Sequence, residues 1–353
     1  MNLYYTQGLI TMFKKVSWKS VCIILFVVIT IYFNIKDYYQ EIYFSIKNLS
    51  IMIIFSFVCY GALYYILQAI NLWILTKLQI PNYTLKQAIQ NNYITLFINN
   101  IFFAATGKLS QIFLFKKQGI SIDKATSIVF LDFLNFQIMI LIYYSIIFFL
   151  NISFYQQNFK YELILAIIGA VICIVVTLFL LFIVLFPKYQ KIIINIVQLC
   201  LNKLPIKTNN IEKNLNEIFN KFNVSREYLF KQKKIFILIT LINFIRLTLL
   251  LLIPYFSAKA IGIKLTISDI PSFISLIIFV YLVLSSIPIP GKHGVSESIF
   301  TIAFSHILLP YQAATLMIIW RFITYYSNTI IGGIFLIFNK DIKMKDLKEI
   351  RKK

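Results

Sequence analysis

The chain has 353 residues, 59% of them apolar, and a mean hydropathy of +0.80. One soluble domain of this length cannot bury so much apolar surface, so the composition excludes an ordinary soluble protein and predicts an all-α polytopic membrane protein. The formal net charge of +21 does not indicate nucleic-acid binding, because the basic residues are spread between apolar segments instead of being gathered in one soluble module.

Eight apolar runs approach the roughly 20 residues that a helix needs to cross a bilayer. The first run follows three lysines and has no small-residue cleavage site, which favours a retained anchor over a removed signal peptide. We therefore expect about eight transmembrane helices, at residues 17–35, 49–75, 123–150, 162–186, 234–257, 270–288, 295–309 and 311–338.

The distribution of Lys and Arg predicts the topology. If the N-terminus is inside, the inward segments carry 25 of these residues and the outward loops carry 5. The positive-inside rule then predicts a multi-pass protein of the cell (plasma or inner) membrane with both termini in the cytoplasm. The expected division is an N-terminal membrane half (1–187), a cytoplasmic amphipathic linker (188–233), a C-terminal membrane half (234–339) and a basic cytoplasmic tail (340–353).

Two polar, broken passages interrupt the apolar pattern. In residues 84–118, Thr84 can cap a helix, but a break around Gly107 and Lys108 separates it from a second apolar run. A re-entrant hairpin is predicted, because irregular backbone is tolerated at membrane depth only where protein or water surrounds it.

The second break, residues 285–297, reads SSIPIPGKHGVSE and contains Gly291, Lys292, Gly294 and Glu297. Free N–H groups at a helix start, together with a lysine, suit an anion. The passage is not a nucleotide-binding P-loop. His293 and Glu297 are too few ligands for a metal site, and we expect no metal or other cofactor.

An internal repeat is indicated by comparing these breaks. A shift of 184 residues places Gly107-Lys108 on Gly291-Lys292, and a shift of 189 places Asp132 on Arg321. The matched spans run in opposite directions, as inverted-topology repeats require. We expect the two breaks to approach each other from opposite leaflets, and Asp132 and Arg321 to form an ion pair.

Charged residues inside the spans must face the protein interior or water, because each costs about 2.5–3.5 kcal/mol at a helix centre. Two interpretations stay open: ion pairs that only hold the bundle together, or an arginine that binds a lipid phosphate through two hydrogen bonds. The candidate substrate-binding residues are Gly107, Lys108, Asp132, Arg246, Gly291, Lys292, Gly294, Glu297 and Arg321. No candidate catalytic residue is assigned.

The passage Pro288-x-Pro-Gly-x-x-Gly-Val-x-Glu297, followed by Trp320-Arg-Phe-Ile-Thr-Tyr-Tyr326 and Gly332, resembles a flippase-like membrane family. That family includes the membrane region of lysylphosphatidylglycerol synthases. The block Gly107-Lys-Leu-Ser-Gln-Ile-Phe-Leu-Phe-Lys-Lys-Gln-Gly119 is similar to the family's other characteristic segment. The resemblance implies handling of an anionic phospholipid or a polyprenyl-linked glycolipid between leaflets during envelope biogenesis.

The leading functional hypothesis is therefore a lipid translocase whose partners are membrane lipids. An integral membrane transferase with Glu297 or Asp132 as base is one alternative. A non-transporting subunit that contacts envelope polysaccharide synthesis enzymes is another. We expect no synthesis of an aminoacyl-lipid by this chain itself, because its sequence holds no soluble aminoacyl-transferase domain.

Overall fold

The computed structural model describes residues 39–101, 106–159, 162–186, 231–287 and 294–338, together with Asn223 and Glu227. Its regular elements are all helical, which confirms the predicted class within these ranges. Five helices are long and apolar enough to cross a membrane. They are α4 (Ile51–Gln79), α7 (Ile122–Leu150), α9 (Glu162–Leu185), α12 (Lys233–Ala260) and α13 (Ile270–Ser286), the last with the short helix η3 (Ile267–Asp269) before it.

The remaining helices are shorter or interrupted. Three follow one another without a gap near the C-terminus: α15 (Pro310–Arg321), the π-helix η5 (Phe322–Tyr326) and α16 (Ser327–Phe338). The others are α3 (Tyr39–Lys47), α5 (Leu85–Ile101), α6 (Thr106–Lys117), α8 (Ile152–Asn158) and α14 (Val295–Phe304).

The predicted spans at 49–75, 123–150, 162–186, 234–257 and 270–288 correspond to the five long apolar helices. The predicted span at 295–309 is wrong, because α14 has 10 residues and so extends only about 15 Å at about 1.5 Å per residue. The hydrocarbon core is about 30 Å thick. The span predicted at 311–338 is helical but passes through η5, and the one at 17–35 lies outside the described residues.

Local sequence explains where the helices begin. Ser50 caps α4 by accepting a hydrogen bond from the Ile53 N–H at 3.3 Å. Thr84 and Gln87 form a reciprocal capping box before α5, as expected for Thr84. Thr266 and Asp269 form the same arrangement before α13. Each satisfies backbone N–H groups that have no partner inside the helix.

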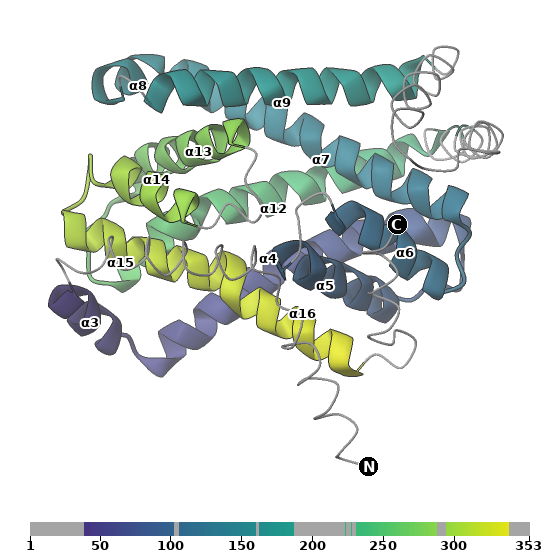
Figure 1. Ribbon diagram of the computed structural model, residues 1–353, viewed down its shortest axis with the longest axis horizontal. Coiled ribbons are helices and arrows are strands. Elements are labelled where there is room, and N and C mark those ends of the chain that lie inside the picture. Colours follow the sequence, from purple (N-terminus) through teal and green to yellow (C-terminus); the bar gives the residue numbers. More distant parts are fainter. Residues whose placement is uncertain are drawn as a thin grey trace, which may run out of the picture.

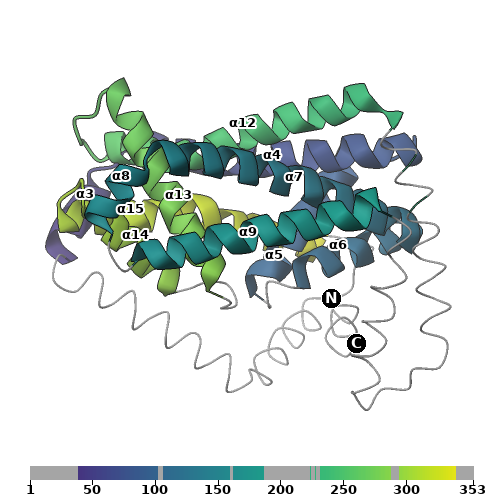
Figure 2. The same ribbon diagram turned by 90° about the horizontal axis from the view of Figure 1, so that it is seen from above.

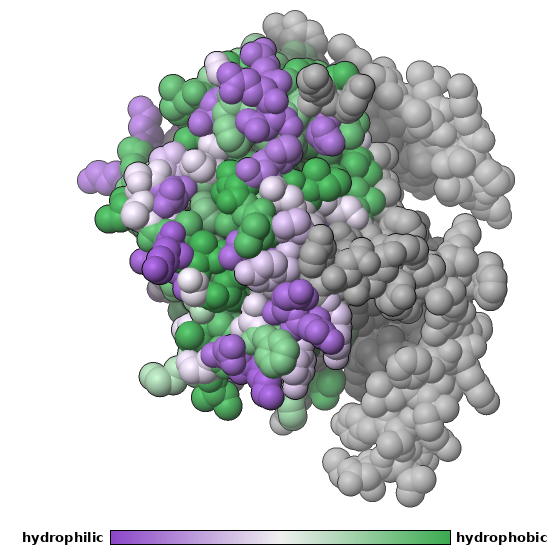
Figure 3. Space-filling view, turned by 90° about the vertical axis from the view of Figure 1, so that its left-hand side faces the viewer, coloured by the Kyte–Doolittle hydropathy of each residue, from purple (hydrophilic) through white to green (hydrophobic). Residues whose placement is uncertain are grey.

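Helices α4, α7, α9 and α12 lie side by side along the longest axis of the molecule, and two hairpins lie at opposite ends (Figure 1). The α5/α6 hairpin lies at one end, beside the end of α4. The α13/α14 hairpin lies at the other, and the view from above agrees (Figure 2). Seen from the α3 and α14 end, polar residues gather among apolar ones (Figure 3). This polar end suits contact with water or lipid head groups.

Helices α4 and α12 cross in opposite directions. The Tyr60 hydroxyl of α4 donates to the carbonyl of Leu249 at 2.8 Å, whereas Asn71, further along α4, meets Asn243, which comes earlier in α12. The two helices therefore run antiparallel through the middle of the bundle. The predicted linker and the basic tail lie outside the described ranges except at isolated positions, so the division into four segments stays a prediction.

Helices α9 and α13 pack closely together at Gly169 of α9. A Cβ atom built on Gly169 would collide with the backbone carbonyl of Leu282. Backbone atoms cannot move aside as a flexible side chain can, so only glycine permits this helix separation. The opposite face of α9 is strongly apolar and exposed, as expected for a helix that faces lipid.

We predict that Gly169→Ala separates α9 from α13 and lowers the thermal unfolding midpoint of the purified protein. Overpacking a close contact typically costs about 1–3 kcal/mol. Val171→Ala, on the exposed face of the same helix, is the matched control and should leave the midpoint almost unchanged. Equal midpoints for the two variants would contradict the close approach.

Candidate functional site

Among the described residues, five charged side chains from five different helices form ion pairs or are buried inside the bundle. They are Lys108 of α6, Asp132 of α7, Arg246 of α12, Glu297 of α14 and Arg321 of α15. Except for Lys108 they are almost completely buried. Their partners therefore decide what this polar centre can do.

Glu297 and Arg321 form a short, buried ion pair. The Arg321 Nε atom lies 2.8 Å from Glu297 Oε1. The second carboxylate oxygen accepts a hydrogen bond from the Ser296 hydroxyl at 2.8 Å. Gly294, the N-cap of α14, has a φ of 81°, a left-handed conformation that favours glycine. This turn directs the first residues of α14, including Glu297, toward α15.

Lys108 and Asp132 form a looser pair at the other hairpin. The Lys108 Nζ atom lies 3.5 Å from Asp132 Oδ2 and 3.3 Å from Gln111 Oε1. The Lys108 side chain is 39% exposed, whereas that of Asp132 is 3% exposed. This pair therefore connects α6 to α7, as the first connects α14 to α15, but it is open on the lysine side.

Arg246 has no such partner. It is 1% exposed, and within the described ranges no carboxylate forms an ion pair with it. Its guanidinium carbon lies 3.9 Å from the Phe136 ring centroid and 5.2 Å from that of Tyr64. Its Nε and Nη1 atoms are buried and have no hydrogen-bond partner among the described residues.

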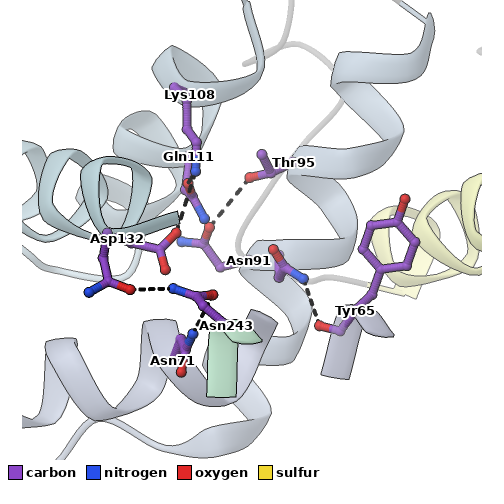
Figure 4. A network of polar contacts seen from close by, with 10 residues as sticks. Tyr65, Asn71, Asn91, Thr95, Lys108, Gln111, Asp132 and Asn243 are labelled. Atoms are coloured by element: carbon purple, nitrogen blue, oxygen red, sulfur yellow. Dashed lines mark hydrogen bonds and ion pairs between the residues drawn. The ribbon is translucent and has the colours of Figure 1, made fainter. Parts of the chain in front are cut away.

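An asparagine network fixes the helix that carries Arg246 (Figure 4). Asn243, one turn before Arg246, accepts a hydrogen bond from Asn71 of α4 at 2.8 Å and donates to Asn135 of α7 at 2.6 Å. Asn135 donates in turn to Thr240 at 2.8 Å. The network joins three long helices, so α12 cannot rotate Arg246 away without breaking buried hydrogen bonds.

The structure brings the residues predicted from sequence together in pairs. Lys108 contacts Asp132, and Glu297 contacts Arg321, whereas Arg246 packs against aromatic rings. Gly107 lies in the first turn of α6, and Gly294 caps α14. Gly291 and Lys292 lie outside the described residues, and so does the predicted approach of the two Gly-Lys breaks.

The ion pair expected between Asp132 and Arg321 is wrong. Each of these residues pairs with a short helix of its own hairpin, because α14 delivers Glu297 to Arg321 and α6 delivers Lys108 to Asp132. Sequence reasoning also missed the network of Asn71, Asn135 and Asn243. The available signal was three amide side chains inside otherwise apolar spans.

Five long apolar helices around a buried, charged centre define a multi-pass membrane protein. The match to the family model for the lysylphosphatidylglycerol synthase transmembrane region extends over residues 5–332. The chain belongs to this family, which relates it to the lipids of the cell envelope. No curated protein and no solved structure matches the chain.

We predict that Glu297→Gln strongly destabilises the protein, because removing one partner of a buried ion pair typically costs about 3–5 kcal/mol. Thermal unfolding in detergent measures the effect. The double variant Glu297→Gln with Arg321→Gln should be less destabilised than the sum of its single variants, since no charge is left alone. Purely additive effects would show that the contact does not stabilise the fold.

Proposed function

We propose that this protein is a lipid translocase in which the phosphate of a membrane lipid binds Arg246, between two halves of inverted topology. The observation that carries the proposal is the buried guanidinium of Arg246, which has two unpartnered donor atoms and no described carboxylate in contact. An anionic ligand would supply the missing charge and hydrogen-bond acceptors.

Magnitudes support an anionic occupant. Contacts between a desolvated cation and aromatic rings contribute up to about 2 kcal/mol, whereas a charge at the centre of a span costs about 2.5–3.5 kcal/mol. Unpaired buried donors add a further cost. The rings of Phe136 and Tyr64 therefore offset only part of the penalty, and a phosphate that accepts two guanidinium hydrogen bonds would offset more.

The position of Arg246 also supports a central site. Arg246 and Tyr64 are each the fourteenth residue of their helices, α12 and α4, and they contact each other where these antiparallel helices cross. Equivalent residues of two repeats can touch only close to the symmetry axis that relates them. In inverted-repeat transporters this axis lies in the membrane plane, and substrates bind close to it.

The proposed ligand class is a lipid with a phosphate in its head group, either an anionic phospholipid or a polyprenyl-linked glycolipid. Both share the chemistry that a guanidinium recognises. Gly291, Lys292 and the backbone around Gly294 are proposed as further contacts, and Gly107 with Lys108 as contacts in the first half. Asp132 and Glu297 balance the charges of Lys108 and Arg321. A plasma-membrane location with cytoplasmic termini belongs to the same proposal.

We predict that the protein purified from membranes retains an anionic lipid and that Arg246→Gln retains at least about tenfold less. Two lost charge-assisted hydrogen bonds at about 1.5–3 kcal/mol each justify a loss of this order. Native mass spectrometry gives the amount and the mass of the lipid. Lys259→Gln, a lysine at the end of the same helix, is the control and should retain the wild-type amount.

Liposomes loaded with labelled phosphatidylglycerol or phosphatidylcholine then separate the possible activities. A translocase moves the anionic lipid to the other leaflet with its mass unchanged, and Arg246→Gln slows this movement. A product of new mass would instead indicate a transferase. Equal lipid retention by Arg246→Gln and the wild type would overturn the proposed site.

A further inference from the structure

The two central ion pairs occupy equivalent positions in their hairpins. Lys108 is the third residue of α6, and Glu297 is the third residue of α14. In each pair the partner lies 24 residues further along the chain, at Asp132 in α7 and Arg321 in α15. The equivalent residues have opposite charges: the short helix carries the base in the first half and the acid in the second.

The surrounding elements follow the same plan. Helices α5 and α13 each have 17 residues and follow a capping box, Thr84 with Gln87 and Thr266 with Asp269. In both halves the second helix of the hairpin packs against the first and against the helix that follows the hairpin. The equivalence of the two ion pairs therefore extends to the helices that present them.

We propose that Lys108–Asp132 and Glu297–Arg321 are the two gates of one alternating-access cycle, with the second gate closed and the first loosened in this structure. The inference rests on the proposed function, since the gates control access to Arg246. Each pair joins the start of a short helix, next to the break in its hairpin, to the helix that follows it in the chain. Its release frees the hairpin at one membrane face only.

The unequal geometry of the pairs supports opposite states. The Glu297–Arg321 contact is short and both side chains are buried, whereas Lys108 is 3.5 Å from Asp132 and 39% exposed. Lys116 and Lys117 end α6 on the basic side of the membrane, which the positive-inside rule assigns to the cytoplasm. On this proposal the looser of the two gates is the cytoplasmic one.

Hydrogen exchange of the full chain in phosphatidylglycerol nanodiscs tests this coupling. In the wild type, amides of α6 should exchange faster than those of α14. Glu297→Gln should raise exchange in α14 several-fold and, at the same time, lower it in α6, because opening one gate closes the other. Glu162→Gln, at the start of the lipid-facing helix α9, is the control and should change neither helix.

Faster hydrogen exchange in α14 without slower exchange in α6 would contradict the proposed gates. It would show that Glu297–Arg321 stabilises only its own hairpin. This readout does not require lipid movement. If the reciprocal change in hydrogen exchange occurs while Arg246→Gln retains the wild-type amount of lipid, the gate proposal is supported and the proposed lipid site is wrong. If lipid retention depends on Arg246 but the hydrogen exchange of α6 and α14 does not change reciprocally, the proposed lipid site is supported and the gate proposal is wrong.

Swapping the charges of the first ion pair tests whether the two ion pairs are equivalent, even if Glu297→Gln fails to fold. The variant Lys108→Glu with Asp132→Arg gives the first half the charges already present in the second. The double variant should fold, and the amides of its α6 should exchange hydrogen at the wild-type rate or more slowly. Lys108→Glu alone places two carboxylates together and should therefore lower the yield of folded protein. If the double variant is as impaired as Lys108→Glu alone, the two pairs are not equivalent.

Discussion

A charge inside a membrane needs a partner, and this requirement organises the centre of the protein. Glu297 with Arg321 and Lys108 with Asp132 satisfy it inside the bundle. Each pair joins a helix too short to cross the membrane to the helix that follows it in the chain. Arg246 is the exception among the described residues, because none of their carboxylates forms an ion pair with it and aromatic rings lie against its guanidinium.

The packing around Arg246 holds this unpaired side chain in its position. Asn71, Asn135 and Asn243 hydrogen-bond across three helices, and Asn243 lies one turn before the arginine on α12. Amides buried in hydrocarbon keep such partners. Rotation of α12 would therefore sacrifice buried hydrogen bonds without bringing a carboxylate to Arg246. An unpaired cation held in place at a helix crossing has the properties of a binding site for an anion.

Much of the fold could be predicted from the sequence because lipid imposes a simple rule on helix length and polarity. The predicted runs at 49–75, 123–150, 162–186, 234–257 and 270–288 correspond to α4, α7, α9, α12 and α13. The partners of the buried charges could not be predicted in this way. They depend on how many residues a broken hairpin contains before its second helix begins. Alignment of the two Gly-Lys motifs paired Lys108 with Lys292, whereas the helix starts make Glu297 the equivalent residue.

The central claim is that the phosphate of a lipid binds the guanidinium of Arg246. An electron cryomicroscopy structure in nanodiscs that contain phosphatidylglycerol tests it most directly. The account predicts phosphate density within hydrogen-bond distance of the Arg246 guanidinium, with Glu297 still on Arg321. An Arg246 side chain that contacts only Phe136 and Tyr64, or that pairs with a carboxylate of the chain itself, would contradict it.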